Sequence, residues 1–282
     1  MLPPLLVLDP LLENWLREDL GRGDRTTQAI FFGHAKIGQA SWIAKEAGVI
    51  AGLPVAERVF QLLNPTIHFT PTVAEGEFCP KSKVIAEIEG SFDALLIGER
   101  VALNLAMRLS GIASATRQYV EKIADLSTRL VDTRKTTPGL RILEKYASGI
   151  GGAINHRLGL DDAIMIKDNH IQAAGSIEEA VRRVRQNMPY PLTIEVETSQ
   201  LEEVNQALEQ QVEIIMLDNM DLEMMQTAVE MIRNFNSKTK IEASGNITLD
   251  RIRNVAETGV DYISTSAPIT RSTWLDISMR ID

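Results

Sequence analysis

The second half of the chain repeats one pattern that few folds can accommodate: a short apolar run, a polar loop and a helical segment. The apolar runs are Leu130–Val131, Ala163–Ile166, Leu192–Val196, Ile214–Leu217, Ile241–Ala243 and Tyr262–Ile263. Strands that alternate with helices predict a parallel sheet joined by right-handed crossovers. Because only about 140 residues carry the pattern, whereas a full eight-stranded barrel takes roughly 250, we expect an open, incomplete α/β barrel.

Some of the helical segments between the runs begin with recognisable caps. Thr137–Pro138 combines a capping residue with the residue best tolerated at the first helical position. Ser176 and Ser199 each have a glutamate three residues later, which is the spacing of a capping box. We therefore expect helices to begin at these three places.

The first part of the chain has a different pattern. Short β-type runs punctuated by glycine and proline fill residues 36–52 and 66–90, which predicts a separate α+β unit. Apolar residues then recur in steps of three and four from Ala102 to Ile123. This spacing predicts one long amphipathic helix.

The long helix is expected to join two domains, since 282 residues are many for a single domain of average size. The first domain covers residues 1–110, and residues 271–282 are expected to pack back onto it. The second domain covers residues 111–270 and contains the α/β barrel.

Composition excludes several classes of partner. The formal charge is −9, which argues against nucleic acid because such ligands need a basic face. No run reaches the roughly 18 apolar residues of a transmembrane helix, and we expect no signal peptide because the N-terminus lacks a basic segment. The single cysteine, Cys79, suits a reducing cytosol. We predict a cytoplasmic protein without nucleic-acid or membrane partners.

Positive charge is concentrated in one stretch of this acidic chain. From Val131 to His170, six basic residues outnumber five acidic ones, so this stretch carries +1 and the remainder −10. His156 and His170 also lie there. A basic island indicates an anionic ligand. His34 and His68, in contrast, we interpret as structural.

Polar residues follow every apolar run at its carboxyl end. They are Asp132–Lys135, Lys167–Asp168, Glu197, Asp218–Asn219, Ser244–Asn246 and Ser264–Ser266. In α/β barrels the loops after the strands converge on one mouth, where the chemistry takes place. A single residue of this kind is more often a solvated loop residue or a helix cap. Six successive runs that end alike predict an active site.

Cations dominate the first of these strand ends. Arg134 and Lys135 are adjacent and tend to point to different sides, so one can bind a planar carboxylate and the other a phosphate. His156 and Arg157 follow a pair of glycines, in a segment flexible enough to curl over a ligand. Lys167 leaves a buried strand and can be a phosphate clamp, a Schiff-base amine or a solvated lysine.

Acidic and small polar residues dominate the later strand ends. Glu197 and Asp218 end consecutive strands. Carboxylates there can hold Mg²⁺, bind sugar hydroxyls, stabilise a developing positive charge or pair with the lysines. Ser244–Asn246 and Thr265–Ala267 suit a phosphate that rests on backbone N–H groups.

The string VDTRKTTPGLRILEKYASGIGGAINHRLGLDDAIMIKDNH resembles the signature of the quinolinate phosphoribosyltransferase family. The segments EDLGRGDRTT, GERVALNLAMRLSGIA, IEVET, IMLDNM, IEASGNI and YISTSAPITRS resemble that family in order and spacing. The likeness spans nearly the whole chain. It implies the type II phosphoribosyltransferase fold, an N-terminal α/β sandwich followed by an open α/β barrel of seven strands, one more than the apolar runs predict.

The resemblance also implies the reaction. Quinolinate and 5-phosphoribosyl 1-pyrophosphate would give nicotinate mononucleotide, pyrophosphate and CO₂, in NAD biosynthesis. Mg²⁺ would be held mainly by the pyrophosphate, with Glu197 and Asp218 as candidate protein ligands, and no organic cofactor is implied. Arg100 matches an arginine that the family donates across a dimer interface, which implies a homodimer or a larger assembly.

Individual roles follow from the same resemblance. The residues implied around the quinolinate carboxylates are Arg134, His156, Arg157 and Lys167. Those implied at the ribose and pyrophosphate are Lys135, Glu197 and Asp218, with Thr133 beside them in the motif. Those implied at the 5′-phosphate are Ser244, Gly245, Asn246, Thr265, Ser266 and Ala267. The implied catalytic residues are Lys135, Lys167, Glu197 and Asp218.

Three other interpretations fit the sequence less well. A related transferase that does not decarboxylate would bind a monoacid, which needs fewer cations than this stretch supplies. A Schiff-base aldolase would use Lys167, but Asp168 and the other nearby acids favour a charged lysine. A catalytically silent dimer that senses the same ligands would not need Lys135, Glu197 and Asp218.

Overall fold

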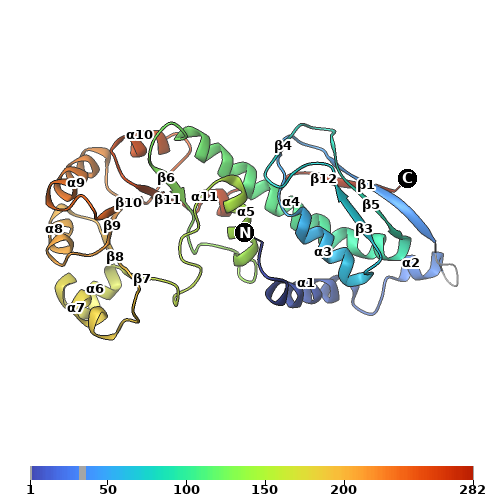
Figure 1. Ribbon diagram of the computed structural model, residues 1–282, viewed down its shortest axis with the longest axis horizontal. Helices are drawn as coiled ribbons and strands as arrows, with labels where there is room; N and C mark the ends of the chain where they lie inside the picture. The colour runs from blue at the N-terminus through green and yellow to red at the C-terminus, as the bar shows by residue number, and fades with distance from the viewer. Residues whose placement is uncertain (1, 32–35, 282) are drawn as a thin grey trace. The chain divides into compact units, whose positions relative to one another are not determined.

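The computed structural model describes residues 2–31 and 36–281, which form two compact units. The first consists of Met1–Arg117, Thr137–Gly152 and Arg271–Asp282, and the second of Gln118–Thr136 and Ala153–Thr270. Helix α4 (Phe92–Lys122) begins in the first unit and ends in the second (Figure 1). The predicted long helix is thus confirmed, while His34 lies outside the described residues.

An antiparallel sheet forms the centre of the first unit. Its strands are β1 (Ile37–Ala44), β3 (His68–Pro71), β5 (Val84–Ser91) and β12 (Ile277–Ile281), with a separate pair β2 (Gly48–Val49) and β4 (Phe78–Cys79). Their order in the described part is β12-β1-β5-β3. Strand β12 pairs with β1 from Ala40↔Ile281 to Ala44↔Ile277. The C-terminal residues therefore complete the sheet of the first unit.

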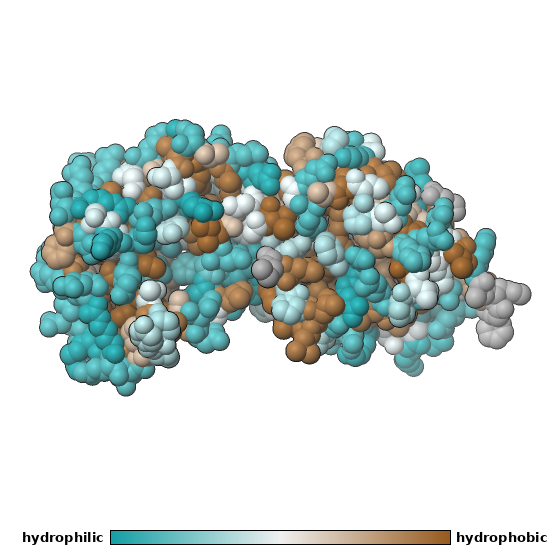
Figure 2. Space-filling view, viewed as in Figure 1, coloured by the Kyte–Doolittle hydropathy of each residue, from teal (hydrophilic) through white to brown (hydrophobic). Residues whose placement is uncertain are grey.

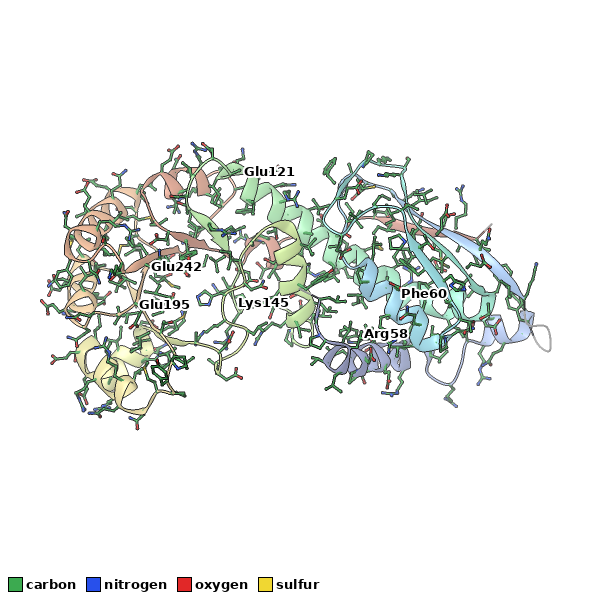
Figure 3. All side chains as sticks on the ribbon, viewed as in Figure 1. Arg58, Phe60, Glu121, Lys145, Glu195 and Glu242 are labelled. Atoms are coloured by element: carbon green, nitrogen blue, oxygen red, sulfur yellow. The ribbon has the colours of Figure 1, made fainter. Side chains whose placement is uncertain are left out.

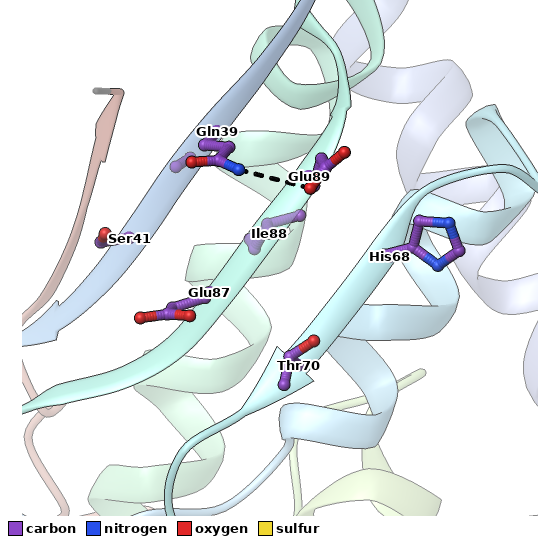
Figure 4. A pocket seen from close by; sticks show the side chains of 8 residues that line it. Gln39, Ser41, His68, Thr70, Glu87, Ile88 and Glu89 are labelled. Carbon is purple, nitrogen blue, oxygen red and sulfur yellow. Dashed lines mark hydrogen bonds between the residues drawn. The ribbon is translucent and has the colours of Figure 1, made fainter.

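Helices pack on one face of this sheet, and the other face is polar. The helices of the unit are α1 (Leu5–Leu20), α2 (Arg25–Ile30), α3 (Leu53–Leu63), most of α4 and α5 (Arg141–Gly151). Trp42 and Phe69 of the sheet contact Phe60 of α3, with ring centroids 6.2 and 6.1 Å from it. Figure 4 shows the opposite face, where His68 and Glu87 are exposed. Alternation along the strands separates the two faces.

A parallel sheet forms the second unit. Its strands are β6 (Arg129–Val131), β7 (Ile164–Ile166), β8 (Ile194–Thr198), β9 (Ile214–Asp218), β10 (Lys240–Ser244) and β11 (Tyr262–Ser264). Among the described residues their order is β6-β11-β10-β9-β8-β7, and every neighbouring pair is parallel. Each of the six predicted apolar runs forms a strand, and the predicted open α/β barrel is confirmed.

The seventh strand implied by the family resemblance is reduced to a single bridge. Ile154 pairs in parallel with Val131. Its N–H donates to the carbonyl of Leu130 at 2.9 Å, and its own carbonyl accepts the N–H of Asp132 at 3.1 Å. The apolar pattern missed this strand because Ala153 and Ile154, between two glycines and Asn155, are too short a run to show periodicity.

Helices connect the strands of the second unit and supply its outer layer. They are α6 (Asp168–Ala174), α7 (Ile177–Asn187), α8 (Leu201–Glu209), α9 (Leu222–Phe235), α10 (Ile252–Glu257) and α11 (Ala267–Thr270). Their apolar sides join the strands in one core cluster that includes Val181, Ala207 and Ile232. Over the stretches that the structure describes, no helix has both the length and the apolar character to cross a bilayer.

Two of the three predicted helix starts in this region are shifted. Ser176 is confirmed as a cap, since its hydroxyl accepts the N–H of Glu179 at 3.1 Å. The predicted cap at Ser199 is wrong by one residue, because Gln200 and Glu203 form the reciprocal pair ahead of α8.

The predicted helix start at Thr137–Pro138 is wrong, because α5 begins at Arg141. The buried carboxylate of Glu144 accepts the backbone N–H of Thr137 at 2.8 Å and its hydroxyl at 2.9 Å. Arg108 binds the same carboxylate at 2.7 Å. These bonds satisfy the polar groups of Thr137 outside the helix, so the loop continues to residue 140.

Candidate active site

The carboxyl ends of the parallel strands surround one cavity of about 580 Å³. The predicted site residues that line it are Thr133, Arg134, Lys135, His156, Arg157, Lys167, Glu197, Asp218, Ser244, Gly245 and Asn246. Parallel strands of one sheet end on the same side, so residues far apart in the sequence meet there. The structure therefore brings most of the predicted residues together in the second unit.

The predicted phosphate residues after β11 do not line this cavity. Thr265 is buried, and its hydroxyl donates to the carbonyl of Ile247 at 3.4 Å and accepts the N–H of Ala267 at 3.2 Å. The carbonyl of Ser266 accepts the N–H of Thr270 at 2.8 Å, within the first turn of α11. Their contact with a substrate phosphate stays a prediction.

Arg100 is placed in the first unit. Its exposed side chain lies on α4 and lines a groove together with Trp15, Asn104 and Trp274. Its predicted role in the site of a partner subunit stays a prediction.

Of the other residues that line the cavity, Asn219 and Ser264 were predicted only as polar strand ends, and the sequence interpretation missed Met165, Met216 and Glu242. A signal for them exists in the strand period. Each lies two positions before a predicted site residue, and a strand directs residues two apart to the same side. The glutamate was also detectable as a charge inside the apolar run of β10.

Lys167 and Glu197 form an ion pair across the ends of β7 and β8. The lysine side chain is 42% exposed and the glutamate side chain 15%, so the ammonium group reaches the open part of the cavity. The N–H of Lys167 donates to Nδ1 of His170 at 3.0 Å, which fixes the turn into α6. An ammonium bound to a carboxylate has no free lone pair for a Schiff base.

Two arginines supply further positive charge. Arg157 donates from Nη1 to the carbonyl of Ala163 at 2.8 Å. Burial and the neighbouring Arg134 lower the pKa of Arg157, but its guanidinium remains charged because arginine titrates far above neutral pH. The buried Nε of Arg134 has no protein hydrogen-bond partner among the described residues. Two guanidiniums with unused donors suit an anion with two carboxylates.

Asp132 holds the loops that carry these cations. Its buried carboxylate accepts hydrogen bonds from Nδ2 of Asn155 at 2.7 Å and from the backbone N–H of His156 at 2.8 Å. The N–H of Lys135 donates to the hydroxyl of Thr133 at 3.0 Å, while the Lys135 side chain is exposed. The backbone of both loops is thus held in place and the ammonium group of Lys135 is left for a ligand.

Asn219 joins the loops after β9 and β10. Its side chain donates to the carboxylate of Asp218 at 2.7 Å and accepts Nδ2 of Asn246 at 3.0 Å, and its N–H donates to the carbonyl of Ser244 at 2.9 Å. Gly245 has φ +93°, and a Cβ there would lie 2.2 Å from Oδ1 of Asn219. This close approach allows only glycine.

Two glutamates lie buried inside the barrel, Glu195 on β8 and Glu242 on β10 (Figure 3). Nε2 of His156 lies 3.2 Å from Oε2 of Glu195 and 3.7 Å from Oε2 of Glu242. In each carboxyl group the other oxygen, Oε1, is buried and has no hydrogen-bond partner among the described residues. Burial and then the charge of Glu195 raise the pKa of Glu242 to about 7, so Glu242 carries a proton up to neutral pH.

Comparison with known proteins identifies the family. The N-terminal domain profile of quinolinate phosphoribosyl transferase matches residues 24–110, and the C-terminal domain profile matches residues 112–280. The chain belongs to the quinolinate phosphoribosyltransferase family. All residues that line the cavity fall in the segment matched to the C-terminal domain, whereas Arg100 falls in the N-terminal one.

Two bacterial relatives and one solved structure match over nearly their whole length. A probable nicotinate-nucleotide pyrophosphorylase [carboxylating] of Synechocystis sp. is 63% identical over 280 residues, 99% of this chain and 94% of that protein. The corresponding Bacillus subtilis protein is 43% identical, over 98% of this chain and 94% of its own. The crystal structure of NadC from Streptococcus pyogenes has 41% identity and a TM-score of 0.94, and covers 100% of this chain and 99% of that one.

The buried carboxyl group of Glu242 predicts a pH-dependent stability. An acid whose pKa is raised from 4.5 to about 7 by folding binds more protons in the folded state between these values, so the free energy of unfolding falls as pH rises through that window. Glu242→Gln cannot ionise and should lose this fall, a difference on the order of 3 kcal/mol between pH 5 and pH 8.

Urea unfolding at both pH values measures the effect. Glu87→Gln is the matched control, because Glu87 is exposed on the sheet of the first unit. An unchanged pH dependence in Glu242→Gln would contradict the prediction.

Proposed function

We propose that this chain catalyses the decarboxylating phosphoribosyl transfer of its family: quinolinate and 5-phosphoribosyl 1-pyrophosphate give nicotinate mononucleotide, pyrophosphate and CO₂, a step in NAD biosynthesis. One observation carries the proposal. A single cavity at the strand ends gathers Arg134, Arg157 and Lys167 together with Glu197 and Asp218. Three cations suit a dicarboxylate, and two carboxylates suit a sugar that develops positive charge.

Quinolinate carries two carboxylates on adjacent ring carbons, and their removal from water is costly unless fixed cations compensate. Arg134 and Arg157 offer planar donors, and Lys167 offers a mobile point charge. When the substrate enters, the ammonium of Lys167 can move from Glu197 to a substrate carboxylate. Glu197 then becomes available to the ribose.

The phosphoribosyl donor binds on the other side of the cavity. The exposed ammonium of Lys135 suits its phosphates. The loop Ser244–Asn246 suits the 5′-phosphate, because Gly245 and the bonds of Asn219 bring its backbone close to the cavity. We keep Thr265, Ser266 and Ala267 as additional contacts to that phosphate.

The chemistry needs positioning and electrostatics more than covalent catalysis. As the anomeric C–O bond breaks, its electron pair leaves with pyrophosphate, and Glu197 and Asp218 stabilise the positive charge that develops on the ribose. The pyridine nitrogen bonds to the anomeric carbon and becomes cationic. It then stabilises the electron pair left on the adjacent carbon when CO₂ departs, and a proton takes the place of the carboxyl group. No organic cofactor is required.

The site fits a Mg²⁺ ion that binds together with phosphoribosyl pyrophosphate. Glu197 and Asp218 provide the oxygen ligands that it prefers, and it is commonly held by one or two carboxylates together with substrate phosphates. Both carboxylates line the cavity and are only partly buried. When bound, the ion would neutralise charge on the pyrophosphate.

We also propose that the chain forms a homodimer or a larger assembly in which Arg100 completes the site of the neighbouring subunit. The exposed position of Arg100 supports this. Apolar side chains gather on the surface over α1 (Figure 2), where Leu5, Leu6 and Val7 are exposed, Leu6 to 88%. Large exposed apolar groups often mark protein contacts.

Two further predictions are kept as proposals. The first is the division into domains over residues 1–110 with 271–282 and over residues 111–270, supported by the profiles, which meet between residues 110 and 112. The compact units differ from it in placing residues 111–117 and 137–152 with the first part.

The second of these proposals is a cytoplasmic location, supported by the unpaired, buried Cys79.

Release of labelled CO₂ tests the function. The protein is expected to release it from carboxyl-labelled quinolinate when phosphoribosyl pyrophosphate and Mg²⁺ are both present, and the product is expected to be nicotinate mononucleotide. Omission of phosphoribosyl pyrophosphate is the control, since decarboxylation requires the cationic nitrogen. Transfer to nicotinate without CO₂ would instead favour a non-decarboxylating transferase. Borohydride trapping of a carbonyl substrate on Lys167 would favour an aldolase.

A further inference from the structure

Asn219 is the first residue after β9 and lies beside the first residue after β10. In the register of the two strands Asp218 pairs with Ser244, so Asn219 and Gly245 follow at the same edge of the sheet. The N–H of Asn219 donates to the carbonyl of Ser244 at 2.9 Å. A Cβ on Gly245 would lie 2.8 Å from the backbone nitrogen of Asn219. The two loops therefore run in direct contact at this point.

The side chain of Asn219 makes one hydrogen bond to each of these loops. A carboxylate can only accept a hydrogen bond, so the atom that faces Asp218 at 2.7 Å is Nδ2. The other end of the amide, Oδ1, accepts the bond from Nδ2 of Asn246 at 3.0 Å. One amide thus serves a partner that needs a donor and a partner that needs an acceptor.

The backbone at this junction also favours asparagine. Asn219 has φ +55° and Asn246 has φ +50°, in the left-handed region that asparagine tolerates better than most residues with a side chain. The carbonyl of Asn246 accepts Nη1 of Arg251 at 3.3 Å, and the next residue, Ile247, is buried. The loop Ser244–Asn246 is therefore held on both sides by the protein itself.

We propose that Asn219 is a positioning residue for the phosphoribosyl donor: it fixes the carboxylate of Asp218 and the loop Ser244–Asn246 in a single arrangement. The inference rests on the proposed function, which assigns Asp218 to the ribose and the loop to the 5′-phosphate. The ribose sets the distance between its anomeric carbon and its 5′-phosphate, so the two protein groups that receive them need a matching distance. A side chain bonded to both groups keeps that distance before the donor arrives, and less order has to be created on binding.

Asn219 acts through its neighbours, although it lines the cavity. Each end of its amide is already bonded to a protein group. The bond to Oδ2 of Asp218 orients that carboxylate, so Oδ1 of Asp218 is the oxygen that a ribose hydroxyl would meet. Loss of the amide should therefore affect the phosphoribosyl donor and leave the binding of quinolinate nearly unchanged.

Urea unfolding of the ligand-free protein tests the link between the loops. Asn219→Gly and Asn246→Ala each remove the same bond between side chains, and a double variant can lose that bond only once. The unfolding constant of the double variant should therefore be at least about threefold smaller than the product of the two single effects. A double variant whose effect equals that product would overturn the proposal.

Steady-state kinetics tests the positioning role. Asn219→Gly allows the left-handed turn but removes both side-chain bonds, so it should raise KM for phosphoribosyl pyrophosphate about tenfold and lower kcat about tenfold. KM for quinolinate should stay within about threefold of the native value. Partial unfolding would lower kcat alone, because the molecules that remain folded would keep the native KM. Asn187→Ala, at an exposed position at the end of α7, is the matched control and should keep native kinetics.

Asn219→Asp separates the two bonds. Aspartate also tolerates the left-handed region and keeps an acceptor for Asn246, but it sets a second carboxylate against Asp218. This variant should lose at least about tenfold in kcat. Native kcat in Asn219→Asp, or an equal rise in both KM values in Asn219→Gly, would contradict the proposal. If the native protein releases no CO₂, the proposed function fails, while the unfolding experiment still decides whether Asn219 links the loops.

Discussion

Replacement of Lys167 by alanine is expected to lower kcat/KM for quinolinate by about two to three orders of magnitude. The substitution removes one of the three cations proposed to bind the dicarboxylate, all of which line the cavity. It also leaves Glu197, whose side chain is 15% exposed, without its ion-pair partner. The loss therefore combines weaker binding of quinolinate with an uncompensated negative charge in its site.

Steady-state kinetics with quinolinate as the varied substrate measures this loss. Lys167→Arg keeps the positive charge but changes the shape of the side chain, so its kcat/KM should lie between those of Lys167→Ala and the native protein. Lys238→Ala is the matched control, because Lys238 is an exposed lysine of the same unit that precedes the amino end of β10. If Lys167→Ala retained kcat/KM within a factor of about three of the native value, the proposed dicarboxylate clamp would be wrong.

Arg100→Ala and Lys135→Ala chains are each expected to be nearly inactive alone and to recover activity when mixed. If Arg100 serves the neighbouring site, a mixed dimer has one site with neither change and one site with both. Random exchange makes half of the dimers mixed, so recovery should approach roughly one quarter of native activity. The measurement is CO₂ release after subunit exchange has been verified by mass.

A second mixture provides the control for this experiment. Lys135 and Lys167 line the same cavity of one chain, so Lys135→Ala mixed with Lys167→Ala leaves no intact site and should recover nothing. Recovery in neither mixture would show that Arg100 acts in its own subunit or not at all. Recovery in both would show that the variants regain activity for another reason.

The placement of residues at strand ends was predictable because it depends on local features. A strand buried on both faces is a short apolar run, and the first polar residue after it marks the carboxyl end. In this way the sequence alone predicts Arg134, Lys167, Glu197 and Asp218 as site residues. Parallel topology then requires that such ends meet at one edge of the sheet.

The roles inside the barrel were not predictable in this way. His156 was interpreted as a cation for the substrate, and only the tertiary structure shows that its Nε2 lies beside the buried carboxyl groups of Glu195 and Glu242. Glu195 and Glu242 are 47 residues apart in the sequence. Their meeting depends on β9 lying between β8 and β10.

The sequence by itself determined the strands of the barrel, the basic stretch from Val131 to His170 and the family to which the chain belongs. Only the tertiary structure decided the order of the strands, the single bridge at Ile154, the pairing of β12 with β1, and the buried group around His156. The reason is how far apart in the sequence the determining residues lie. Hydrophobic periodicity and the ends of strands depend on residues close together in the chain, whereas strand register and burial depend on partners up to hundreds of residues away.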